Sequence, residues 1–178
     1  MKVILSEGNQ VERDGDKVER PRQPWSAHVM RFVQHLEGDG LPVERFIGFE
    51  GGKWVSEFAD GDMVHPGKWS DDALYGIGRM VAGLHDSARR FVPQDDDIWQ
   101  PWCLREIGRG ERIICHGDIA PWNLITDNKT PKVLVDWEYA GPLEPMVELA
   151  RVIWLFVQLH DDDLAMLHHL PSPKKRAE

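Results

Sequence analysis

The sequence predicts an α+β fold in which a β-rich first part is followed by a mainly helical second part. Two hairpin signals in the first 60 residues favour strands. The segment NQVERDGDKVER places two short strand-like runs around Asp14-Gly15, and the runs RFIGFE and KWVSEFA flank Glu50-Gly51-Gly52. Later segments repeat their apolar residues every three or four positions, which is typical of helices.

Three segments are predicted to be helices. The first, PWSAHVMRFVQHLEGDG, takes Ser26 as its N-cap and ends at Gly38 and Gly40. The second begins after Ser70, which precedes two acidic first-turn residues, and the third runs from about residue 145 to 170. The Gly-, Pro- and Asp-rich loop DGDMVHPGKW is expected to separate two lobes, residues 1–60 and residues 61–178.

Composition excludes several classes of protein. A net charge of −9 argues against a broad grip on nucleic-acid phosphates; it suits cationic substrates, or it only keeps the protein soluble. The two cysteines form no CxxC pair, which argues against a disulfide scaffold or a zinc site and favours a reducing cytoplasm. No apolar run reaches the ~18 residues of a membrane span. We therefore expect a cytoplasmic protein with no membrane partner.

Two strand-like runs end in polar residues that are suited to phosphoryl transfer. Asp118 follows IICHG and Asp136 follows KVLV, and the turn signal DNKTPK, with Asn128, predicts that these two strands pair. Phosphoryl transfer needs oxygen ligands for metal ions and a carboxylate that orients the attacking hydroxyl. Asn123 and Asp136 offer the oxygens that Mg²⁺ prefers, and Asp118 offers the carboxylate.

The two residues before Asp118 are expected to support the loop. His116 is predicted to fix it by hydrogen bonding, and Gly117 to adopt a backbone shape that a side chain would block. Glu138 either approaches the metal or bonds the loop. Trp122 and Trp137 are expected to pack beneath the loops.

These motifs resemble a known family. HGDIAPWN is similar to the H-G-D-x-x-x-x-N loop of the aminoglycoside phosphotransferase and choline-kinase-like family, and VLVDWEYAGP is similar to its metal-binding strand end. The resemblance covers roughly residues 8 to 157. It implies a protein-kinase-like, two-lobed fold with a compressed N-lobe, Asp118 as the catalytic base, and Asn123 and Asp136 as Mg²⁺ ligands.

The same resemblance implies a nucleotide site for ATP or GTP. The stretch SEFADGD would be the hinge that meets adenine through its backbone, which makes Glu57 and Phe58 nucleotide-binding residues. Arg20 would take the place of the family's usual phosphate-binding lysine, with Lys17 as a weaker candidate.

The sequence also departs from the family pattern. Only a remnant of a glycine-rich loop is present, at Gly8-Asn9, and the helix after Arg20 offers no convincing acidic partner for it. The C-lobe is expected to be shortened, because family members usually continue for several more helices that supply much of the acceptor pocket.

We therefore predict a small-molecule kinase that transfers the γ-phosphoryl group of ATP or GTP, with Mg²⁺, to a hydroxyl of an aminoglycoside-like or other small acceptor, cationic ones included. Its partners would be the nucleotide and the acceptor, without nucleic acid; the sequence does not predict its oligomeric state. One alternative is a catalytically impaired nucleotide-binding module with an incomplete acceptor site. Another is a metal-dependent hydrolase that uses His116 and Asp118 as ligands.

Overall fold

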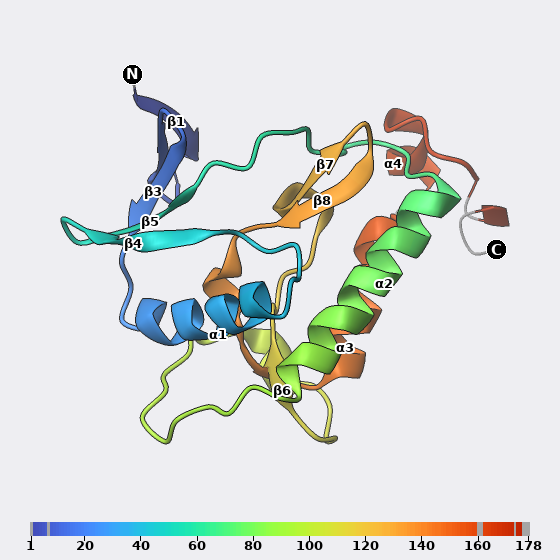
Figure 1. The fold of residues 1–178 in the computed structure, drawn as a ribbon. Helices are drawn as coiled ribbons and strands as arrows, with labels where there is room; N and C mark the ends of the chain where they lie inside the picture. Colours follow the sequence, from blue (N-terminus) through green and yellow to red (C-terminus); the bar gives the residue numbers. More distant parts are fainter. Residues whose placement is uncertain (1, 7, 160–161, 173, 176–178) are drawn as a thin grey trace.

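The first part of the chain is a five-stranded antiparallel sheet in the computed structural model, which describes residues 2–6, 8–159, 162–172 and 174–175. The strand order is β1-β2-β3-β5-β4 (Figure 1). The strands are β1 (Lys2–Ser6), β2 (Val11–Asp14), β3 (Lys17–Pro21), β4 (Phe46–Glu50) and β5 (Lys53–Glu57). Both predicted hairpins are present, whereas the sequence analysis did not predict β1.

Helix α1 (Ser26–Gly38) connects β3 to β4 and lies beside the sheet (Figure 1). Its apolar stripe is buried, with Val33 and Leu36 fully enclosed. The predicted N-cap is wrong by one position, because Trp25 is the cap residue and Ser26 is the first helical residue. The Ser26 Oγ instead accepts a hydrogen bond from the backbone N–H of Gln23, at 2.9 Å, and so closes the turn before the helix.

The second part of the chain contains the remaining helices. Helix α2 (Asp71–Ala88) begins as predicted, with the Ser70 Oγ accepting the N–H of Ala73 at 3.2 Å. The single helix predicted from 145 to 170 is wrong: α3 (Pro145–Phe156) and α4 (Asp162–Leu167) are separate. The chain leaves α3 at Gln158, which has a left-handed φ of 53°. None of the described helices is long and apolar enough to cross a membrane.

Two small antiparallel ladders position the polar loops. Strand β6 (Ile113–Cys115) pairs with β9 (Gly141–Leu143), and β7 (Leu124–Asp127) pairs with β8 (Thr130–Leu134). The tight turn at Asn128 is therefore confirmed, with a φ of 48°. However, the predicted partner was wrong, because that turn joins β8 to β7 and not to β6.

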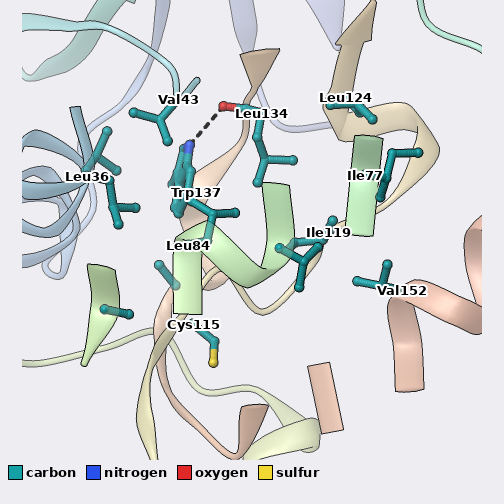
Figure 2. Packing of buried hydrophobic residues seen from close by; sticks show 14 of the residues in the cluster. Leu36, Val43, Ile77, Leu84, Cys115, Ile119, Leu124, Leu134, Trp137 and Val152 are labelled. Carbon is teal, nitrogen blue, oxygen red and sulfur yellow. Dashed lines mark hydrogen bonds between the residues drawn. The ribbon is translucent and has the colours of Figure 1, made fainter. Parts of the chain in front are cut away.

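One hydrophobic core connects both parts of the chain (Figure 2). Leu36 and Val43 from the first part meet Ile77 and Leu84 of α2 and Leu134 of β8. Trp137 lies among them at 1% exposure and donates its Nε1–H to the Leu134 carbonyl at 3.1 Å. Its predicted burial is confirmed. Trp122 was also predicted to pack beneath the loops, but it is 38% exposed, and its ring packs on His65 at the surface.

Candidate active site

The loop that follows β6 has a shape that only glycine permits at its second position. Gly117 has a φ of +84°, and a Cβ built there would lie 2.4 Å from the Tyr139 carbonyl oxygen. A side chain would therefore be strained and would also collide with backbone. The short 3₁₀ helix η2 (Pro121–Asn123) completes the loop and returns the chain to β7.

His116 is buried and uses both of its ring nitrogens inside the protein. Nε2 lies 3.0 Å from the Val135 carbonyl oxygen, and Nδ1 lies 3.1 Å from the Asp118 backbone nitrogen. These partners require a neutral ring that donates from Nε2 and accepts at Nδ1. His116 thus ties the loop to the residue before Asp136. With both nitrogens engaged, it offers no ligand atom to a metal, which argues against the hydrolase alternative.

Asp118 and Asn123 lie side by side at the end of the loop. The Asn123 Nδ2 donates to the Asp118 backbone carbonyl at 2.9 Å and to its carboxylate Oδ2 at 3.0 Å. The side chain of Asp118 is 14% exposed. The spacing of five residues therefore brings an amide against a carboxylate that still reaches the surface.

Asp136 lies next to this pair, because the Val135 N–H donates to the Asn123 backbone carbonyl at 2.9 Å. Its φ of 65° is unusual for a residue with a side chain, and such conformations gather at functional sites. Its side chain is 38% exposed. Asn123, Asp136 and Glu138 provide oxygen donors, and this donor set suits a hard cation such as Mg²⁺.

Arg20 reaches this region from β3 and contacts two carboxylates. Nη1 donates to the Asp136 Oδ1 at 2.9 Å, and Nη2 donates to the Glu44 Oε1 at 3.1 Å. Burial lowers the pKa of Arg20, but Glu44, Asp136 and Glu138 together raise it above its ordinary value. Lys17 pairs instead with Glu50 on an exposed surface at 3.4 Å. Residues three apart on a strand face opposite sides, so only Arg20 can serve this site.

Glu44 is the acidic partner that the sequence analysis missed. Glu44 does not lie on the helix that follows Arg20; it precedes β4 and is 3% exposed. Its carboxylate accepts from Arg20, from the Ser56 hydroxyl and from the Asp136 backbone N–H at 3.2 Å. The sequence held one signal for this role: an acidic residue between Val43 and Arg45, just before the apolar part of a predicted strand.

A cavity of about 200 Å³ opens beside Arg20 and Asp136. Gly8, Asn9 and Gln10 from the β1–β2 connection line it, together with Trp25, Trp54 and Glu138 among others. Burial, and then the nearby Asp136, raises the pKa of Glu138, whereas Arg20 lowers it. The remnant glycine loop therefore lines a pocket that also holds a cation and acidic oxygens.

Glu57 and Phe58 lie elsewhere and do not line this cavity. They line a separate hollow with Arg13 and Asp16, where the Arg13 guanidinium stacks 3.4 Å from the centre of the Phe58 ring. The Glu57 N–H donates to the Arg45 carbonyl at 2.9 Å, and the Phe58 N–H donates to the Asp16 carbonyl at 2.8 Å. Both backbone donors are thus already occupied, which leaves the carbonyls for a ligand.

A buried cluster supports the loop that carries Gly117 and Asp118. Glu148, from α3, accepts the Gly117 N–H at 2.7 Å through Oε1 and contacts the His85 Nε2 at 2.7 Å through Oε2. Cys115 completes a His-Cys-Glu group compact enough to hold a metal ion. Burial, and then Glu148, raises the pKa of the Cys115 thiol well above its usual range, which disfavours the thiolate that metal binding needs. We therefore describe the group as hydrogen-bonded support for Gly117.

Arg151, also on α3, contacts Asp118 and was not predicted. Its Nη2 and Nε both donate to the Asp118 Oδ1, the latter at 3.2 Å. Its guanidinium carbon lies 5.7 Å from the centre of the Trp102 ring. Trp102 is itself anchored, because its Nε1–H donates to the Gly117 carbonyl at 3.0 Å.

An antiparallel sheet is followed by two loops that bring Asp118, Asn123 and Asp136 together, and Arg20 on β3 lies beside them. This arrangement defines a kinase-like phosphotransferase fold. Comparisons with known proteins agree. Residues 99–170 match the model of the phosphotransferase enzyme family. The predicted resemblance to that family is therefore confirmed.

One curated relative and several solved structures extend the match beyond that segment. The trifolitoxin immunity protein of Rhizobium leguminosarum bv. trifolii is 40% identical over 171 residues, which are 94% of this chain and 66% of that relative. The chain thus spans about two thirds of the relative's length. An amicoumacin kinase, solved with AMP-PNP, Ca²⁺ and Ami, aligns with 98% of this chain and 72% of its own at a TM-score of 0.69 and 13% identity. A microcompartment-associated aminopropanol kinase covers 100% of this chain and 76% of its own, with a TM-score of 0.63 and 17% identity. These structures confirm the predicted α+β, protein-kinase-like fold.

Proposed function

We propose that the chain is a small-molecule kinase that transfers the γ-phosphoryl group of ATP or GTP to a hydroxyl of its acceptor. The observation that carries this proposal is the convergence of Asp118, Asn123 and Asp136 from two loops, with Arg20 beside them. Phosphoryl transfer is catalysed mainly by positioning and by charge stabilisation, and these residues supply both.

Each residue has a separate role in this reaction. Asp118 orients the acceptor hydroxyl and takes its proton as the oxygen bonds to the γ-phosphorus and the bond to the β-phosphate oxygen breaks. Asn123 and Asp136 would hold Mg²⁺, which, when bound, neutralises charge on the phosphates. Arg20 binds phosphate oxygens beneath the loop at Gly8. His116 and Gly117 keep Asp118 in place.

The nucleotide lies, on this proposal, between a lobe of residues 1–60 and a catalytic lobe of residues 61–178. Glu57 and Phe58 would meet adenine through their carbonyl oxygens, because their N–H groups are engaged within the sheet. The next N–H, that of Ala59, donates to no described residue and is the better candidate for the ring nitrogen.

For the acceptor, the relatives suggest a toxin or an antibiotic. The curated relative is named for immunity to trifolitoxin, and one structural neighbour is a kinase solved with Ami. We propose that phosphorylation of such a compound would protect the cell. Cells that express the chain should survive trifolitoxin better than cells that express Asp118→Asn, and equal survival would reject this acceptor.

The kinase reaction is tested by ADP release, measured against aminoglycosides, amino alcohols and sugars with Mg²⁺ and ATP or GTP. We expect Asp118→Asn to abolish turnover, a loss of at least about 100-fold, while Mg²⁺-ATP still raises the melting temperature. Asp127→Asn, at the exposed last residue of β7, is the matched control and should keep full activity. Full turnover by Asp118→Asn would show that the base is wrongly assigned.

The impaired-module alternative makes the opposite prediction for turnover. It expects Mg²⁺-ATP to stabilise the protein while no acceptor is phosphorylated. The geometry favours the kinase, because both the carboxylate at Asp118 and the oxygen donors at Asn123 and Asp136 are in place.

A further inference from the structure

The charge nearest to the proposed base is positive. Arg151 donates from two nitrogens to one carboxylate oxygen of Asp118. Because the base must touch the acceptor hydroxyl, a guanidinium bonded to that base lies within a few ångströms of the bound acceptor. Arg151 is therefore part of the acceptor site, whatever the acceptor is.

Arg151 also has N–H groups that donate to none of the described residues. A guanidinium carries five N–H groups and stays charged at any physiological pH. Nε and Nη2 contact Asp118, whereas Nη1 donates to no residue that the structure describes. The side chain is 21% exposed, so a ligand can reach it. Contact with the Trp102 face, at 5.7 Å, holds the group in position.

Two of the acidic groups of the site lie on the nucleotide side, and the third is paired with Arg151. Asp136 and Glu138 line the cavity beside Arg20 and the glycine-loop remnant. Among these three acids, Asp118 is the one beside Arg151, and it is already paired. A polycationic acceptor would thus face the positive charge of Arg151 without an unpaired carboxylate from these three acids beside it.

We propose that Arg151 binds an anionic group of the acceptor, a carboxylate or a phosphate, so that the substrate is an anion-bearing alcohol and not a polyamine. This inference rests on the proposed kinase function. Guanidinium groups bind both kinds of anion through paired hydrogen bonds. A zwitterion, with an amine remote from the anion, also fits.

The test uses acceptor pairs that differ only in the anion. N-acetylserine is compared with N-acetylserinamide for the carboxylate, glucose 6-phosphate with glucose for the phosphate, and kanamycin represents the polycations. ADP release gives kcat and KM for each, in the wild type, in Arg151→Gln and in Arg79→Gln. Arg79 is an exposed arginine of α2 that stacks on Tyr75, and it serves as the matched control.

We expect kcat/KM to favour an anionic partner over its neutral counterpart by about 10- to 100-fold, the value of one charged hydrogen-bonded contact. The pair that shows the preference identifies the anion. Arg151→Gln should bring the ratio near one by raising KM for the anionic acceptor, with KM for Mg²⁺-ATP unchanged. Arg79→Gln should keep the wild-type ratio. A merely structural role would lower activity on both partners equally.

Three results would overturn the inference: a ratio near one in the wild type, a ratio that Arg151→Gln leaves unchanged, or turnover of kanamycin without turnover of either anionic compound. A protein that Mg²⁺-ATP stabilises but that phosphorylates no acceptor would be the impaired module, so the kinase proposal would fail and the inference with it. Failure of the inference alone is distinguishable, because in each of the three results above at least one acceptor is turned over.

Discussion

Replacing Glu148 tests whether the buried cluster beneath the loop positions the site. Its carboxylate accepts from Gly117 and contacts His85, both at 2.7 Å, and it is 2% exposed. A hydrogen bond to a charged group is worth about 1.5–3 kcal/mol, and removal of one partner leaves the other unpaired. We therefore expect Glu148→Ala to lower the free energy of unfolding by about 3–5 kcal/mol. Glu148→Gln, which keeps one acceptor, should cost about 1–3 kcal/mol.

The assay is urea unfolding followed by fluorescence, with kcat measured at a temperature where each variant is folded. Since Gly117 directly precedes Asp118, its displacement should also lower kcat, by up to about 100-fold for a shift near 1 Å. Glu111→Ala, an exposed acid just before β6, is the control and should change unfolding by less than about 0.5 kcal/mol. If Glu148→Ala unfolded like this control, the cluster would not support the loop.

Three further predictions concern other residues of the site. Glu44→Gln should weaken Mg²⁺-ATP binding about tenfold or more, because Arg20 loses a charged partner; titration calorimetry checks this, and unchanged affinity would contradict it. Gly117→Ala should lower stability by more than the ~1 kcal/mol of a positive φ alone, since its Cβ meets the Tyr139 carbonyl; unfolding close to wild type would show that the loop can shift. Glu138 has a raised pKa in the folded state, so ionisation costs stability as pH rises through that value. Glu138→Gln should therefore unfold at higher urea than wild type near pH 7 without metal, with the gain vanishing below the ordinary pKa of 4.5; a gain that persists at low pH would contradict this.

The loop that carries Asp118 could be predicted from sequence because several of its contacts are close along the chain. Asn123 bonds Asp118 five residues away, and the His116 Nδ1 accepts the Asp118 N–H two residues away. Such contacts follow from local spacing. The pairing of β6 with β9 could not be deduced in this way, because strand order depends on which apolar faces meet in the core.

The supporting residues lie far along the chain, which is why the pattern hid them. Arg20 and Glu44 are 24 positions apart, and Arg151 and Asp118 are 33 positions apart. On α3, Glu148 and Arg151 are three residues apart, a spacing that in sequence indicates an ion pair with each other. In the fold, each contacts the proposed catalytic loop instead, Glu148 at Gly117 and Arg151 at Asp118.

The positions of the two acidic partners explain why residue 20 is an arginine. The family resemblance implies a lysine here, but the acid comes from Glu44 before β4, and Asp136 approaches as well. A guanidinium serves the two carboxylates from two nitrogens, 3.1 Å and 2.9 Å away, whereas an ammonium would have to reach both from one atom. Because Glu44 also accepts the Asp136 backbone N–H, Arg20 and Asp136, the proposed phosphate cation and metal ligand, belong to one network. Metal and nucleotide should therefore bind cooperatively, since phosphate that draws Arg20 away releases the Asp136 oxygen for the ion.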